Sequence, residues 1–111
     1  MEEKTDILQG TLDLMVLQTL ATMGRRHGYA IAGRLEQVSN GSIQLNVGTL
    51  YPALVRLEQR GLIRGKWDTT ENNRRARFYE ITPAGRRQLQ RERAGWRRIA
   101  EIMSRLLEGE A

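Results

Sequence analysis

Residues 72–77 (NNRRAR) place three arginines and two amides within six positions, and Lys66 lies shortly before them. Arginine presents a planar fork of N–H donors that fits phosphate oxygens and base edges. On a hairpin beside a groove-reading helix, such side chains could enter a minor groove or clamp its phosphates. We interpret the following as DNA-binding residues: Lys66, Asn73, Arg74, Arg75 and Arg77. The alternative is a solvated turn, although a turn needing only solubility would more often mix Glu and Lys here.

A second candidate surface lies on a helix expected over 46–60, where Leu50, Leu54 and Leu57 turn one face inward. The opposite face is small and nearly free of acid at its front, so it fits a major groove about 12 Å wide. This face holds Gly48, Thr49, Pro52, Val55, Arg56 and Gln59, with Tyr51 at the flank. Hydroxyls and a guanidinium can bind phosphate or guanine, so Thr49, Tyr51 and Arg56 are candidates for DNA binding. Pro52, on the same outward face, is a further candidate that would help to set the register of the helix in the groove. A polar outer face is also what any third helix of a small bundle has.

Residues for catalysis or metal binding are scarce. The chain has no cysteine, and His27 is its one histidine. A metal site or a catalytic triad needs partners that the sequence does not offer, and its glycines are scattered rather than gathered in a phosphate-binding loop. We therefore predict no enzymatic activity, no cofactor and no metal. His27 is expected to cap the second helix or to contact a phosphate, and Tyr29 is expected to be half buried.

Composition agrees with a polyanionic partner. The 111 residues include 18 Lys and Arg against 13 Asp and Glu, a formal net charge of +5. Only Lys4 and Lys66 are lysines. The N-terminal residues lack the pattern of a signal peptide. The longest apolar segment, 12–23, is too short and too polar to span a bilayer. We expect a cytoplasmic protein without membrane contact.

The elements that must position these residues follow from periodicity. Helices are expected over 10–23, 29–38 and 46–60, then strands over 62–69 and 75–81 around a polar loop. Thr82 and Pro83 suit the start of a long last helix. The predicted fold class is mainly α with a small β-hairpin (α+β): a winged helix-turn-helix over 1–82 and a C-terminal dimerisation helix over 83–111.

The last helix predicts a homodimer. It would be about 40 Å long, and its apolar residues recur by sevens with others between them. The first helix is apolar nearly all round, so we expect the last helix to pack on the partner's helix 8–23. The predicted dimerisation residues are Leu12, Leu89, Trp96, Ile99, Met103 and Leu106.

Trp96 and Met15 could also line a pocket for a small hydrophobic or aromatic effector, the alternative being plain dimer packing. Trp67 is expected in the core or covering the hairpin.

Four segments resemble the PadR family of transcriptional regulators: GTLYPALVRLEQRGLI (48–63), QGTLDLMVLQTLA, HGYAIAGRLE (27–36) and NNRRARFYEITPAGRRQL. The resemblance covers nearly the whole chain and indicates the compact subgroup with a single C-terminal helix. It implies a homodimer that binds an inverted-repeat operator and represses transport, efflux or detoxification genes until an effector arrives. It also implies that helix 46–60 enters the major groove, with Thr49, Tyr51 and Pro52 in the reading stretch and the wing 68–77 beside it. Trp96 resembles a tryptophan that some members place in a drug-binding cavity.

Two other functions remain as alternatives. A winged domain can bind another protein, although the arginine-rich hairpin argues against that. It can also serve as an architectural DNA-binding protein without a sequence target. An enzyme is the weakest alternative, because no nucleophile, metal cluster or cofactor loop is present.

Overall fold

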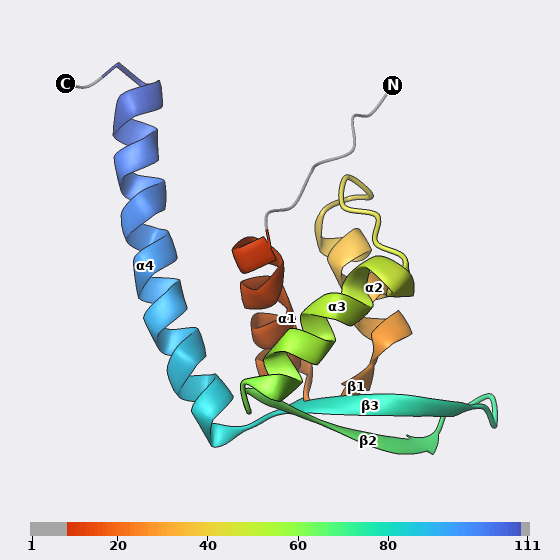
Figure 1. Ribbon diagram of the computed structural model, residues 1–111. Coiled ribbons are helices and arrows are strands. Elements are labelled where there is room, and N and C mark those ends of the chain that lie inside the picture. The colour runs from red at the N-terminus through yellow and green to blue at the C-terminus, as the bar shows by residue number, and fades with distance from the viewer. Residues whose placement is uncertain (1–8, 110–111) are drawn as a thin grey trace.

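The computed structural model of the chain describes residues 9–109, which measure 55 × 38 × 20 Å. Its elements run α1 (Gln9–Met23), β1 (Arg26–His27), α2 (Gly28–Val38), α3 (Val47–Gln59), β2 (Ile63–Thr69), β3 (Arg75–Ile81) and α4 (Pro83–Leu107). Figure 1 shows α3 crossing in front of α1 and α2, with the β2–β3 hairpin below them and α4 to one side. The α+β fold predicted from the sequence is confirmed. Residues 1–8 and 110–111 of the predicted domain ranges, including the first residue of helix 8–23, lie outside the described residues.

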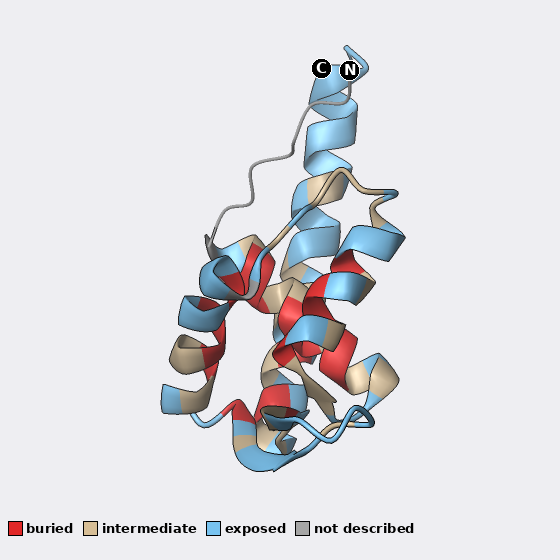
Figure 2. Cartoon of the chain, turned by 90° about the vertical axis from the view of Figure 1, so that its right-hand side faces the viewer, coloured by how far each residue is buried: buried red, intermediate tan, exposed pale blue. Residues whose placement is uncertain are grey.

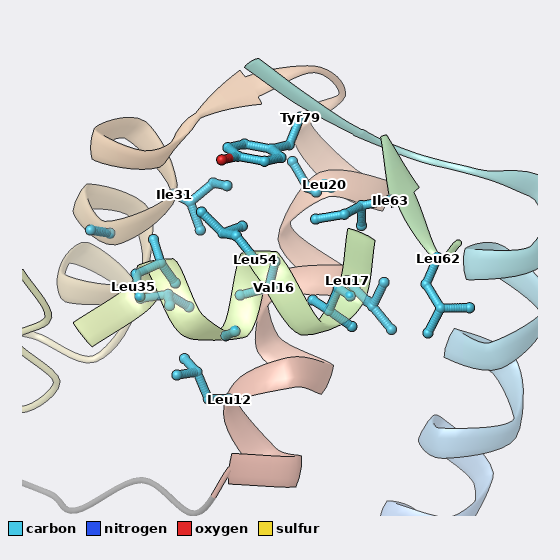
Figure 3. Packing of buried hydrophobic residues seen from close by; sticks show 14 of the residues in the cluster. Leu12, Val16, Leu17, Leu20, Ile31, Leu35, Leu54, Leu62, Ile63 and Tyr79 are labelled. Carbon is cyan, nitrogen blue, oxygen red and sulfur yellow. The ribbon is translucent and has the colours of Figure 1, made fainter. Parts of the chain in front are cut away.

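The core forms where α1, α2 and α3 meet above the sheet. Leu17, Leu20, Ile31, Leu50 and Leu57 are at most 1% exposed. Buried residues line the facing sides of these helices, whereas residues 101–107 at the far end of α4 are all exposed (Figure 2). In Figure 3 the α1 side chains point towards α3 and α2.

Because α1 packs against α2, α3, β3 and α4 of its own chain, its nearly all-round apolar character is explained within one protomer. Leu12 on α1 is 6% exposed and Leu89 on α4 is 2% exposed, both in this core. The prediction that these two leucines form a dimer seam is therefore wrong: they already contact their own chain.

Local signals set the helix ends. Asn46 caps α3, its Oδ1 accepting from the Thr49 N–H at 2.7 Å, and Thr82 caps α4, its Oγ1 accepting from the Gly85 N–H at 3.0 Å. His27 caps α2, because its Nδ1 accepts from the Ala30 N–H at 3.2 Å. Gly61 follows α3 with φ +72, the left-handed conformation that a glycine adopts without strain. These caps confirm the predicted starts of α3 and α4 and the capping role expected for His27.

The sheet has three antiparallel strands in the order β1-β3-β2, not the two that the sequence predicts. Arg26 and His27 of β1 pair with Tyr79 and Phe78 of β3. Two residues are too few to show a periodic pattern, so this short strand could not be predicted from the sequence. The central strand β3 thus joins the loop before α2 to the hairpin.

The junction between hairpin and α4 is tight. The Thr82 N–H donates to the Leu62 carbonyl at 3.1 Å, and the Thr82 hydroxyl donates to the Gly61 carbonyl at 2.7 Å. A Cβ at Gly85 would collide with that Leu62 carbonyl, so the first turn of α4 lies directly against the start of β2. From this point α4 continues past the rest of the molecule (Figure 1). Within residues 9–109, no helix combines the length and the apolar character needed to cross a membrane.

Candidate nucleic-acid interface

The outer face of α3 is open at its N-terminal half. Thr49, Tyr51 and Pro52 are all exposed, Tyr51 at 55%, and Gly48 adds no side chain beside them. Their exposure follows from the inward turn of Leu50, Leu54 and Leu57 at helical spacing. This face can therefore enter a groove as wide as the DNA major groove without rearrangement.

Arg56 does not belong to that face. Its guanidinium donates to Asp13 on α1 at 2.8 Å, and the two side chains are 31% and 8% exposed. Helical spacing alone had placed Arg56 outward, but a nearly buried carboxylate one helix away attracts the long side chain back over the core. The structure thus contradicts the prediction that Arg56 is free to bind DNA and makes it part of the α1–α3 contact.

The tip of the hairpin is an ordered turn. The Thr70 N–H donates to the Arg74 carbonyl at 2.7 Å, and the Asn73 N–H donates to the Thr70 carbonyl at 2.9 Å. Asn73 has φ 59, a left-handed conformation that asparagine tolerates. Asn73, Arg74 and Arg75 are exposed. The turn therefore presents its side chains at a fixed place.

Three cations of this hairpin form no ion pair within residues 9–109. The described residues form five ion pairs, and none of these uses Lys66, Arg74 or Arg75. All three side chains are exposed. An exposed cation without a carboxylate partner is available to a phosphate, so these three residues could bind a polyanion beside α3.

Arg77 differs from its neighbours. Its guanidinium donates to the Glu58 carboxylate on α3 at 2.6 Å, which raises the pKa of Arg77 above its ordinary value. The same Glu58 oxygen accepts from the Gly65 N–H at 3.3 Å. The sequence predicts Arg77 to be a DNA-binding residue, and the structure pairs it with Glu58, so that it connects the hairpin to α3. Sequence analysis gave Glu58 no role, because no local pattern reveals a partner 19 residues away.

Two aromatic side chains lie where the sequence did not place them. Trp67 on β2 is 54% exposed, not in the core, and the guanidinium groups of Arg75 and Arg77 lie 5.2 and 5.9 Å from its ring centroid. Tyr29 at the start of α2 is 74% exposed, not half buried. Both rings add exposed aromatic surface to the elements that flank α3.

The opposite face of the hairpin is held by Arg25, from the loop after α1. Arg25 donates to Asp68 at 2.7 Å and lies 4.4 Å from the Phe78 ring centroid. The pKa of Asp68 is lowered because its carboxylate accepts from the Thr69 N–H and from Arg25. The hairpin is thus held on one face by Arg25 near its tip, and on the other face by Glu58, which binds Gly65 and Arg77.

A separate cleft of about 460 Å³ opens between α1, α2 and α4. Met15 and Trp96, the two residues expected at an effector pocket, both line it. Three arginines also line it: Arg34, Arg93 and Arg97. Among residues 9–109, no three His, Cys, Asp or Glu side chains come together in a way that could hold a metal ion.

From Trp96 at this cleft to its far end, α4 carries large apolar side chains that the described residues leave exposed. Its exposed large residues are Trp96, Ile99, Ile102, Met103, Leu106 and Leu107, each between 47% and 79% exposed. Four of these were expected from the heptad pattern. Ile102 and Leu107 were missed because they fall outside the sevenfold spacing, although Ile102 precedes Leu106 by one helical turn.

Comparison with known proteins gives a consistent result. Residues 16–91 match the model of the transcriptional regulator PadR-like family. The transcriptional regulator Rv3488 of Mycobacterium tuberculosis is 34% identical over 76 residues, which cover 68% of this chain and 67% of that protein. A 37.1 kDa protein in transposon TN4556 of Streptomyces fradiae is 42% identical over 87 residues, 78% of this chain but only 23% of that protein's length.

A solved structure agrees over most of its length. The crystal structure of a PadR family transcriptional regulator from Eggerthella lenta superposes with a TM-score of 0.72 at 31% identity, covering 90% of this chain and 84% of that one. The similarity extends beyond the matched residues 16–91 into most of the described elements.

Proposed function

Since the chain belongs to the PadR-like family of transcriptional regulators, which bind DNA, we propose that two copies of it bind an inverted-repeat operator and repress transcription there. The observation that carries this proposal is the exposed face of α3 beside three hairpin cations, Lys66, Arg74 and Arg75, which form no ion pair in the described part of the chain. Base edges in a major groove are read by short polar and apolar side chains, whereas phosphates are held by cations.

In this proposal α3 enters the major groove with Thr49, Tyr51 and Pro52 foremost. Lys66, Asn73, Arg74 and Arg75 bind the neighbouring phosphates or the minor groove. Arg77 and Arg56 serve the framework, each held by a carboxylate. The winged domain spans the chain up to residue 82, and the helix from residue 83 onwards joins the two copies through Trp96, Ile99, Met103 and Leu106.

The cleft between α1, α2 and α4 is the candidate site for an effector that relieves repression. Its apolar lining with Met15 and Trp96 suits a hydrophobic or aromatic molecule. The three arginines that line it favour a molecule with an acidic group. The regulated genes would then be those for transport, efflux or detoxification of such a compound.

Operator selection tests the proposal. Purified protein is incubated with random duplexes, the bound sequences are recovered, and the best duplex is footprinted. We expect a protected palindrome with two half-sites. An architectural protein would protect no defined sequence, and a protein-interaction module would not enrich any duplex, so either result would refute the proposal.

The wing is tested on the selected operator. Replacing Arg74 or Arg75 by Ala should weaken binding to all duplexes alike and reduce the salt slope by about one unit per lost phosphate contact. Arg105→Ala, near the far end of α4, is the matched control and should leave affinity and slope unchanged. Unchanged binding in Arg74→Ala and Arg75→Ala would show that the hairpin does not contact DNA.

A further inference from the structure

One face of the β2–β3 hairpin is part of the core at its root and extends from there towards the tip. Trp67 is opposite Arg77 in the β2–β3 register, and Gly65 is opposite Tyr79. Because side chains alternate along a strand, Ile63, Gly65 and Trp67 lie on the same face as Tyr79, Arg77 and Arg75. Ile63 and Tyr79 at the root are 2% and 4% exposed, so this is the face turned towards the helices. Trp67 therefore lies where this face of the hairpin changes from buried to exposed.

This face of the hairpin is attached to α3 through Arg77. The guanidinium of Arg77 passes over Gly65 to reach Glu58: a Cβ at Gly65 would lie 2.5 Å from Arg77 Nε and 2.9 Å from its Cζ. Glu58 accepts from Arg77 and from the Gly65 N–H, and so binds both strands of the hairpin to α3. The strands beneath Trp67 consequently have a fixed position relative to the helix.

Arg75 lies next to that anchored surface without an ion pair of its own. Its guanidinium is 5.2 Å from the Trp67 ring centroid, within the range of a cation–π contact. The guanidinium of an exposed arginine otherwise samples many rotamers, and ordering it costs free energy when a phosphate binds. Contact with a fixed aromatic ring removes part of that cost before binding.

We propose that Trp67 is a positioning residue for DNA binding: its ring, held by the Glu58–Arg77 pair, orients Arg75 towards a phosphate beside α3. This inference rests on the proposed function and assigns a role to a residue that the fold does not need in its core. Trp67 acts through Arg75, so its removal lowers affinity only while Arg75 is present.

The test is a double-mutant cycle on the selected operator with the full-length protein. Trp67→Leu keeps apolar bulk but lacks an aromatic face, and should weaken binding about fivefold, the cost of ordering one long side chain. Trp67→Phe should retain most of the affinity. In the Arg75→Ala background, Trp67→Leu should have no further effect. Thermal unfolding should be the same for Trp67→Leu and Trp67→Phe, because neither reaches the core.

A second readout needs no DNA. In a Trp96→Phe background, with its oligomeric state checked by sedimentation, Trp67 is the remaining tryptophan. Replacing Arg75 by Ala should then increase quenching of its fluorescence by acrylamide, and Arg74→Ala should not. Equal quenching in both variants would overturn the contact itself.

The outcomes separate the two proposals. If Trp67→Leu and Arg75→Ala weaken binding additively, Trp67 acts independently of Arg75 and the positioning role is wrong. If Arg75→Ala has no effect on affinity or salt slope although quenching increases, the contact exists but the proposed DNA contact of the wing fails.

Discussion

Among the individual side chains, carboxylates divide the basic residues on and beside α3 and the hairpin into two groups. Arg25, Arg56 and Arg77 are held by Asp68, Asp13 and Glu58 in that order. Lys66, Arg74 and Arg75 have no such partner among the described residues. Arg25 aside, the sequence treats these basic residues as one group of DNA-binding candidates. It could not divide this group, because each partner comes from a distant part of the chain.

The Asp13–Arg56 pair permits a sharp test of this division. Asp13→Ala leaves the guanidinium of Arg56 partly buried without its carboxylate, and should lower the free energy of unfolding by about 3 kcal/mol in urea denaturation. The double variant Asp13→Leu with Arg56→Met should recover most of that loss, because it replaces a buried pair by apolar groups. The double variant should also keep the wild-type salt slope for operator binding. A slope reduced by about one unit would mean that Arg56 does contact a phosphate.

The buried hydroxyl of Tyr79 makes the stability of the protein depend on pH. Burial raises the pKa of its hydroxyl above the ordinary value. The folded protein therefore holds the Tyr79 proton at a pH where the unfolded chain has already lost it. The resulting contribution to the free energy of unfolding is complete below about pH 10, and it is lost as the pH rises through the raised pKa. Urea midpoints measured across that range should fall more steeply for the wild type than for Tyr79→Phe. Tyr29→Phe, which removes a hydroxyl from an exposed ring, is the control; an equal slope in wild type and Tyr79→Phe would contradict the assignment.

At the scale of elements, the ends of α3 and α4 could be predicted because their signals are local. Asn46, Thr82 and Gly61 act on backbone groups within a few residues of themselves. The strand β1 could not be predicted, because its two residues pair with β3 more than 50 positions away. The heptad pattern of α4 likewise did not reveal that Leu89 faces its own α1 while Ile99 and Met103 remain exposed.

The close packing between the hairpin and α4 predicts how a substitution at Gly85 changes stability. Gly85→Ala places a methyl group against the Leu62 carbonyl, which is backbone and cannot rotate away. We expect a loss of about 3 kcal/mol in unfolding free energy. Gly33→Ala on α2 is the control: nothing lies within 4 Å of its Cβ, so the substitution should stabilise the helix by up to about 1 kcal/mol. Equal stability of the two variants would show that the junction is not closely packed.

For the whole molecule, the exposed apolar side of α4 is the main feature that one protomer leaves without a partner. Ile99→Glu with Met103→Glu should convert the proposed dimer to a monomer in sedimentation equilibrium, because two charges cannot be buried at low cost in an apolar interface. The monomer should bind a single half-site weakly and lose its preference for the palindrome. Ser104→Glu lies on the polar side of the same helix and should leave the dimer intact. A dimer that survives the double substitution would place the interface elsewhere.

The tight junction at Thr82 has a mechanical consequence for such a pair. Hydrogen bonds to Gly61 and Leu62 join the start of α4 to the hairpin base, so the helix and the winged body turn together. A helix of 25 residues is about 37 Å long, so a tilt of about 5° at its far end moves the near end by about 3 Å. That arc approaches the rise of one base pair. In the proposed dimer, a small change in the angle of α4 would therefore shift each α3 along its groove by about one base pair, which would weaken binding to the operator.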